Sequence, residues 1–303
     1  MSRRAAARRG KLAARAGGSR RRHTGMVPLG FAALFALMAG APGLFTLPSP
    51  ATHDPGRCSI RRGDGRFQDL LSPSRQHWFG TDTQGCDVFA RVVHGARVSV
   101  TIGIGAVLIA SVVGALVGGL AALAGGRVDG LASRVIDTTL GIPPIVLAIL
   151  LLSTRDHRTL GLVTVVIGSL GVPAAARIAR ASCMEILHRT FIESARASGA
   201  SPARVLLRHV VPNAAPSMLA FASLSVGPAI AVESTAAFLG LSVDPPAAGW
   251  GVQVAEGRLR LFDHPYLLLL PMFFLVAATL TFVALGDGVQ RWLDPRLGGS
   301  FSR

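Results

Sequence analysis

Residues 193–212 read ESARASGASPARVLLRHVVP, a polar and alanine-rich stretch that lies between long apolar ones. Gly199 is near its middle and is a residue that allows a sharp turn. Ser201 and Pro202 follow, and these suit a helix N-cap and the first helical position. The stretch therefore predicts two short helices that are separated by a turn at Gly199 and Ala200.

The amino-acid composition indicates the class of protein that carries these two helices. Half of the 303 residues are hydrophobic and 16% are charged, yet the formal net charge is +15. Water-soluble globular domains do not combine these values, so the chain is predicted to be an all-α polytopic membrane protein. Two short exposed helices on a membrane protein require a soluble partner.

Apolar windows long enough to cross a bilayer recur along the chain and predict six transmembrane helices. They cover residues 27–47, 98–124, 131–153, 160–176, 214–240 and 266–285. Prolines inside several windows predict kinked helices within a bundle. Gly114 and Gly118 form a small-xxx-small pair that predicts close helix packing, with a neighbour in the same chain or in another.

Basic residues orient the bundle, because Lys and Arg are enriched in cytoplasmic loops. With the N-terminus in the cytoplasm, 20 of the 31 Lys and Arg residues fall on the cytoplasmic side, and so do both termini and residues 193–212. The predicted organisation is a basic arm (1–26), a first span (27–47), an external loop (48–97), a core of five spans (98–289) that contains the loop 189–212, and a cytoplasmic tail (290–303). Trp78, Trp250, Tyr266 and Trp292 are predicted to be interfacial aromatic residues.

The basic arm offers nucleic-acid binding as an alternative. Because the arm lies directly before an apolar span, positive-inside retention and attraction to membrane lipid explain it more simply, and no nucleic-acid partner is predicted. The cysteines and histidines show no metal-ligand spacing, so no metal site is predicted. Cys58 and Cys86 share the external loop, where they can form a disulfide or remain separate small residues.

Motifs along the chain resemble those of one transporter family. Residues 193–212 keep Glu193, Ala195, Gly199 and Pro212 at the spacing of the cytoplasmic signature of bacterial ABC importer permeases, with Ser194 where alanine is usual. Further matches are His77–Asp82, Gly85, Asp87–Phe89, Arg91–Val92, Gly95–Arg97, Phe238–Leu241, Pro245–Pro246, Trp250–Gly251, Ala255–Arg258, Leu285–Gly288 and Leu293–Arg296. Over about residues 76–297 the chain is similar to the oligopeptide/dipeptide (peptide/nickel) permease family, of the second-permease (C-subunit) type.

This resemblance implies a type I ABC importer permease fold in the bacterial cytoplasmic membrane. It implies a second homologous permease that encloses a translocation path with this chain, two ATPase subunits and an extracytoplasmic substrate-binding protein. The implied cargo is di- or oligopeptides, with nickel chelates or glutathione as alternatives. The chain has no phosphate-binding Gly-x-x-x-x-Gly-Lys-Ser/Thr loop, so ATP and Mg are expected on the partner ATPases and this chain is expected to be a non-catalytic subunit without cofactors.

The resemblance also implies that a helix from about Thr190 to Ser198 docks on an ATPase subunit, while residues 201–210 pack back on the membrane core. The predicted coupling interface consists of Glu193, Ala195, Arg196, Gly199, Ala200, Arg204 and Pro212. Glu193 is expected to make an ionic or capping contact there, or to be a solvated helix charge. Glu233, in the fifth apolar window, is a candidate for a pathway or gating role or for a structural hydrogen bond.

Two other classes fit the sequence less well. An intramembrane enzyme would need a histidine to activate one of the serines in the apolar windows, and no histidine lies in a window. A secondary transporter would show inverted repeats or several intramembrane charges, whereas the only acidic residues in the windows are Asp137 and Glu233.

Overall fold

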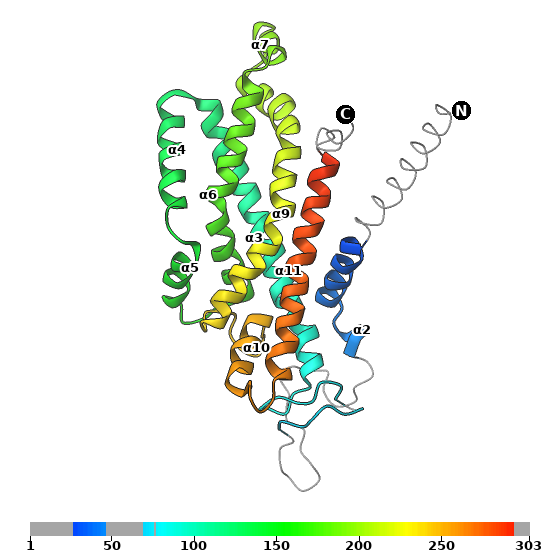
Figure 1. The fold of residues 1–303 in the computed structure, drawn as a ribbon. Coiled ribbons are helices and arrows are strands. Elements are labelled where there is room, and N and C mark those ends of the chain that lie inside the picture. Colours follow the sequence, from blue (N-terminus) through cyan, green and yellow to red (C-terminus); the bar gives the residue numbers. More distant parts are fainter. Residues whose placement is uncertain (1–26, 47–68, 76, 294–303) are drawn as a thin grey trace, which may run out of the picture.

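The computed structural model describes residues 27–46, 69–75 and 77–293, and within these residues the fold is a helical bundle (Figure 1). The predicted basic arm, the C-terminal tail after residue 293 and Cys58 lie outside the described residues. The helices are Val27–Gly40, α2 (Gly43–Thr46), α3 (Val88–Ala124), α4 (Gly126–Leu140), α5 (Pro144–Ser153), α6 (Leu160–Leu187), α7 (Thr190–Ala197), α8 (Pro202–Val205), a π-helical turn (Leu206–Val210), α9 (Val211–Phe238), α10 (Trp250–Gly257), a 3-10 turn (Arg258–Arg260) and α11 (Tyr266–Leu293).

Four of the predicted spans are long apolar helices, namely α3, α6, the continuous run Pro202–Phe238 and α11. All four extend beyond their apolar windows, since α3 begins at Val88, α6 continues to Leu187, the third run begins at Pro202 and α11 continues to Leu293. These extensions carry polar residues, which hydropathy alone excludes from a span. The first predicted span corresponds to the shorter helix Val27–Gly40.

The third predicted span is two helices and not one kinked helix. α4 and α5 meet at an angle of 84° across residues 141–143. Pro143 and Pro144 have no N–H to donate to the preceding turn, so the helical hydrogen bonds stop there. In Figure 1, α4 begins at the end of the bundle that carries α7, and α5 ends towards the end that carries α10, so the pair crosses the bundle as one broken span.

Close packing of α3 against α6 shows where the small-xxx-small pair acts. A Cβ added at Gly114 would lie 2.8 Å from the backbone nitrogen of Ala176, and one at Gly118 would lie 2.8 Å from that of Arg180. Only glycine allows such an approach of two helix backbones. The neighbour that the sequence left open is therefore a helix of the same chain.

Trp250, at the start of α10, is fully buried in the bundle and is not the interfacial residue that was predicted. Its ring contacts Phe35 edge-on, with centroids 5.9 Å apart, and its indole Nε1 donates a hydrogen bond of 2.9 Å to the carbonyl of Val92. Its ring also lies 6.5 Å from that of Phe274. Trp250 thus joins the helix Val27–Gly40, α3 and α11, whereas Trp78 and Trp292 are exposed as interfacial residues would be.

The bundle has two distinct ends (Figure 1). At one end, which we call the α7 end, α7 stands beyond the tips of α6 and α9, and α11 finishes on the same side. At the other end, which we call the α10 end, α10 lies with the loops that lead into α3, α6 and α11. Each end carries one candidate functional region.

Candidate functional site

α7 is anchored to the bundle by one apolar face. Ile192 is its buried residue, and it belongs to an apolar cluster with Val205 and Val210 of the following segment. The other buried members of the cluster are Ala122 of α3, Cys183 of α6 and Ala214 of α9. A displacement of α7 would therefore be passed directly to three membrane helices.

The turn after α7 has the geometry that the sequence predicted. Gly199 adopts a φ of +80°, in the left-handed region that favours glycine, and its N–H donates to the carbonyl of Arg196 at 2.9 Å. The N–H of Ala200 donates to the carbonyl of Ala195 at 3.1 Å, which completes the helix C-terminus. Ser201 then caps the next helix, because its hydroxyl accepts a hydrogen bond from the N–H of Arg204.

The helix after this turn begins at Pro202 as predicted, but it does not end at Val210. It continues through the π-helical turn Leu206–Val210 into α9, so residues 202–238 form one run. Pro212 cannot donate to the carbonyl of Arg208, and a π-helical turn is a common way to accommodate such a missing hydrogen bond. The second predicted short helix is thus the first part of the fifth span, to which it is rigidly connected.

The free face of α7 combines charged and apolar groups. Glu193, in the first turn, and Arg196, in the last turn, are both exposed, and among the described residues the side chain of Glu193 makes no ion pair or hydrogen bond. Phe191 is exposed beside them, with its ring 6.4 Å from that of His209. Such a mixed, solvent-accessible surface is typical of a protein docking site.

The remaining predicted coupling residues lie close to α7 in the chain and differ in exposure. Arg204 and Pro212 are exposed, whereas Ala195 and Ala200 are half-buried. Ala200 packs against the apolar cluster that holds α7 to the bundle. The structure therefore divides the predicted interface into exposed residues that a partner can reach and residues that support the turn.

Glu233 lies inside the bundle and is only 1% exposed. One carboxylate oxygen accepts a hydrogen bond of 3.1 Å from the hydroxyl of Ser234, and the other has no hydrogen-bond partner among the described residues. A Cβ added at Gly249 would lie 3.3 Å from that second oxygen, which shows how closely the loop before α10 approaches. Glu233 thus lies where α9 packs against the loop before α10.

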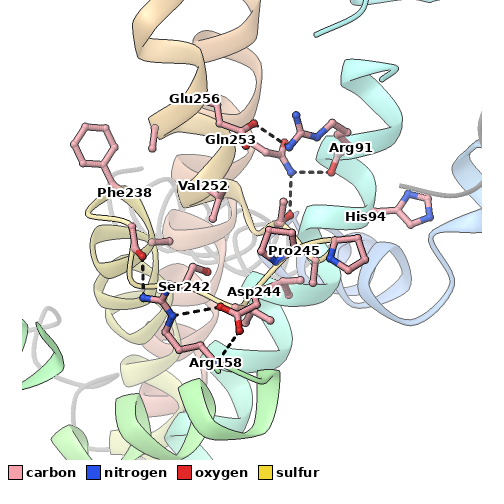
Figure 2. A pocket seen from close by; sticks show the side chains of 18 of the residues that line it. Arg91, His94, Arg158, Phe238, Ser242, Asp244, Pro245, Val252, Gln253 and Glu256 are labelled. Atoms are coloured by element: carbon pink, nitrogen blue, oxygen red, sulfur yellow. Dashed lines mark hydrogen bonds and ion pairs between the residues drawn. The ribbon is translucent and has the colours of Figure 1, made fainter. Parts of the chain in front are cut away.

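A large cavity of about 1420 Å³ opens at the α10 end (Figure 2). It lies between the start of α3, the loop between α5 and α6, the loop between α9 and α10, and α10 itself. Its charged lining residues are Arg91, Arg97, Arg158, Asp244, Glu256 and Arg258. Glu233 is not among the lining residues.

One wall of this cavity is fastened by Arg158 and Asp244, which point toward each other in Figure 2. The backbone N–H of Arg158 donates to a carboxylate oxygen of Asp244 at 2.8 Å, and its guanidinium donates to the carbonyl of Gly240 at 3.0 Å. The backbone hydrogen bond from Arg158 is the main reason why the pKa of Asp244 lies below its ordinary value. This contact joins the loop before α6 to the loop before α10.

The opposite wall is fastened by Arg91 of α3. Its guanidinium forms an ion pair of 2.9 Å with Glu256 of α10 and a second ion pair with Asp82. Gln253 donates hydrogen bonds to the carbonyls of Arg91 and Ala248, at 2.8 and 3.1 Å. These contacts hold α10 across the cavity from the Arg158 wall (Figure 2).

Sequence reasoning missed these cavity residues as a group. Arg158 and Asp244 are far apart in the chain, and no periodicity or motif relates them. The resemblance did mark Arg91–Val92, Gly95–Arg97, Phe238–Leu241, Pro245–Pro246 and Ala255–Arg258 as motif residues. It gave no indication that these motifs would line one cavity.

The sequence profile of one family, described as "Binding-protein-dependent transport system inner membrane component", matches residues 95–299. The chain belongs to this family. The match includes α7, the turn at Gly199 and most of the cavity lining, so both candidate regions are parts of the inner membrane component. The helix Val27–Gly40 lies outside the match.

Several curated relatives within this inner membrane component family are similar to the chain over most of their length. It is 34% identical to Probable D,D-dipeptide transport system permease protein DdpC of Escherichia coli, over 84% of this chain and 83% of the relative. It is 36% identical to dipeptide transport system permease protein DppC of Bacillus subtilis, over 75% of this chain and 71% of the relative. It is also 36% identical to glutathione transport system permease protein GsiD of Shigella dysenteriae, over 75% of each chain.

The fold agrees with this membership. A solved structure of the MetNI methionine ABC transporter in an inward-facing conformation superposes with a TM-score of 0.56, over 67% of this chain and 96% of the other, at 19% identity. That likeness concerns the fold alone. The chain is thus a multi-pass membrane permease of the ABC importer type.

Proposed function

We propose that this chain is one of two permease subunits that together carry di- or oligopeptides into a bacterial cell, driven by two ATPase subunits. In this proposal the α7 end faces the cytoplasm, together with both termini. The α10 end faces outward and receives cargo from an extracytoplasmic binding protein. The predicted topology, in which 20 of the 31 Lys and Arg residues fall on the cytoplasmic side, supports this orientation.

One observation carries the coupling part of the proposal. α7 presents an exposed mixed face around Glu193 and Arg196, and its buried face is locked to α3, α6 and α9 through Ile192. A partner that binds the exposed face can therefore move the helices without bending α7. Rocking of one bundle against another is a known route to alternating access.

The glycine turn and the continuous helix Pro202–Phe238 complete this coupling element. The turn at Gly199 reverses the chain, so the force on α7 reaches α9 through a helix that has no break. Arg204 lies in the first turn of that helix, exposed and available to the same partner. We assign the ATPase contact to Glu193, Arg196 and Arg204, with Ala195, Gly199, Ala200 and Pro212 shaping the surface.

The cavity at the α10 end fits the entrance of the path. Its volume exceeds that of a typical small-molecule site and leaves room for a short peptide, and its walls carry both basic and acidic groups that can meet the two ends of a peptide. Glu233 fits a structural role better than direct cargo contact, because it is buried behind the loop before α10. We expect ATP and Mg to be held by the ATPase subunits and this chain to catalyse no reaction itself.

The proposal is tested by assembling the chain with the second permease, the ATPases and the binding protein from its own genome neighbourhood. In proteoliposomes, ATP hydrolysis should rise when a peptide and the binding protein are added. The measurement is the rate of phosphate release with and without a panel of di- and oligopeptides. A complex that does not form would contradict the assigned partner subunits. A complex whose ATP hydrolysis responds to no peptide would contradict the peptide assignment.

Glutathione transport is the second candidate, since the relative GsiD carries that name at 36% identity. Glutathione is a short peptide with two carboxylates, so the same cavity chemistry would serve it. The assay above separates the cargoes if glutathione is included in the panel. Nickel chelates belong in the same panel, and stimulation by them alone would replace peptides as the assigned cargo.

A further inference from the structure

The break between α4 and α5 exposes polar backbone in the middle of a membrane span. Ile142 is the central residue of the apolar window 131–153, and it lies in the irregular segment between the two helices. Residues 141–144 are all exposed in the described chain. Pro144 has no N–H to offer the carbonyl of Leu140, so backbone acceptors at this depth lack their helical partner.

A charged pair lies one helical turn from the break. Asp137 of α4 and Arg177 of α6 form an ion pair of 2.5 Å, and their side chains remain 56% and 57% exposed. Because residues four apart share one face of a helix, Asp137 and Gly141 lie on the same side of α4. Asp137 lies five residues before Ile142, which corresponds to about 7.5 Å of helix at about 1.5 Å per residue, and so lies within one leaflet of the span centre.

Lipid cannot cover this face. Irregular backbone and half-exposed charges at membrane depth are tolerated where they line water or are buried in protein. By contrast, the exposed side chains on α3 form an uninterrupted apolar stripe that suits lipid. These residues are Leu108, Val112, Val113, Leu116, Val117 and Leu120.

We propose that the face formed by Asp137, Arg177 and the break at residues 141–144 lines the water-filled translocation path. The inference rests on the proposed pairing with a second permease, which would close the path from the other side. Backbone carbonyls and the ion pair would then offer hydrogen bonds to a peptide as it passes the middle of the membrane. The break also provides a place where the lining can move while α6 and α9 stay intact.

The test is thiol accessibility in the assembled complex. Ile142→Cys and Val117→Cys are a matched pair, because both side chains are branched, aliphatic and 41% exposed in this chain. The probe is a membrane-impermeant methanethiosulfonate that carries a quaternary ammonium group, and the readout is the mass of the intact chain. Only a thiol in contact with water ionises and reacts, so Ile142→Cys should react at least about tenfold faster than Val117→Cys.

The parent complex gives the background, and Gly141→Cys gives a second position on the same face. Each variant is measured without nucleotide and after trapping with ATP and orthovanadate. Reaction at 141 and 142 in at least one of these states supports the proposal. Rates no higher than that of Val117→Cys in both states would overturn it, whether lipid or protein covers the face.

This outcome is distinguishable from a failure of the proposed function. Peptide-stimulated ATP hydrolysis by the parent complex is measured in the same preparation. A stimulated parent with unreactive cysteines would overturn only the path assignment. An unstimulated parent would count against the peptide importer, while the accessibility of Ile142→Cys would still report which face of the chain meets water.

Discussion

At the scale of single residues, Gly199 carries the clearest requirement. A Cβ added there would meet no atom within 4 Å, so space does not explain the glycine. The φ of +80° does, because the left-handed conformation costs other residues about 1–2 kcal/mol. The turn that connects α7 to the fifth span therefore depends on the absence of a side chain.

Gly199→Val should uncouple the transporter. The β-branched side chain disfavours the left-handed turn, so α7 should leave its position on the apolar cluster around Ile192. We expect normal insertion into the membrane and loss of peptide-stimulated ATP hydrolysis in the assembled complex. Gly130→Val is the matched control, because Gly130 also has open space around its Cβ position but lies within α4 without a positive φ. Equal stimulation in Gly199→Val and Gly130→Val would contradict the coupling role.

At the scale of secondary-structure elements, glycine pairs determine how closely the helices approach. α3 contacts α6 through Gly114 and Gly118, and α9 contacts α11 through Gly227, where an added Cβ would lie 2.7 Å from the carbonyl oxygen of Thr279. In a membrane, helix association depends on such packing, because lipid is as apolar as the side chains. The bundle is therefore sensitive to single methyl groups at these contacts.

Adjacent glycines on α3 give a direct test. Gly118→Ala should destabilise the chain, because the new methyl group would lie 2.8 Å from the backbone nitrogen of Arg180. Overpacking of this kind costs about 1–3 kcal/mol. Gly119→Ala should leave stability nearly unchanged, because its methyl group would lie 3.8 Å from the sulfur of Cys183. Thermal unfolding in detergent measures both, and an equal Tm for the two variants would refute this packing model.

At the scale of the whole molecule, aromatic contacts tie the helix Val27–Gly40 to the rest of the bundle. It lies outside the matched residues 95–299 and is held by aromatic contacts, with Phe35 edge-on to both Trp250 and Phe274. Because the indole N–H of Trp250 also donates a hydrogen bond to Val92 of α3, the helix Val27–Gly40 is tied to the centre of the bundle. It is therefore expected to stabilise the arrangement of α3, α10 and α11.

Phe35→Ala should loosen this attachment. Two edge-on aromatic contacts would be lost, each worth about 0.5–1.5 kcal/mol. We expect a lower Tm in detergent and faster proteolysis on the N-terminal side of the helix. Leu29→Ala is the control on the same helix, because Leu29 is exposed and its loss should change neither measurement. An unchanged Tm in Phe35→Ala would show that the helix is held by other contacts.

The class of the molecule and the local geometry around α7 follow from the order of the residues alone. Apolar windows mark spans because side chains that face lipid are largely apolar, and Gly199, Ser201 and Pro202 specify a turn and a cap through bonds to their near neighbours. Both kinds of signal are local. The motifs at residues 193–212 likewise sufficed to indicate the family.

Features that depend on distant partners could be known only from the folded bundle. Pro143 and Pro144 predicted a kink, but the 84° angle and its exposed backbone depend on how α4 and α5 pack on α6 and α9. The sequence also did not predict the burial of Trp250, the Arg158–Asp244 contact or the α6 surface that contacts Gly118. Residues far apart in the chain create each of these features. Hydropathy reports the surroundings of a residue on average, whereas the cavity and the path-lining face arise from which particular groups the folded bundle brings together.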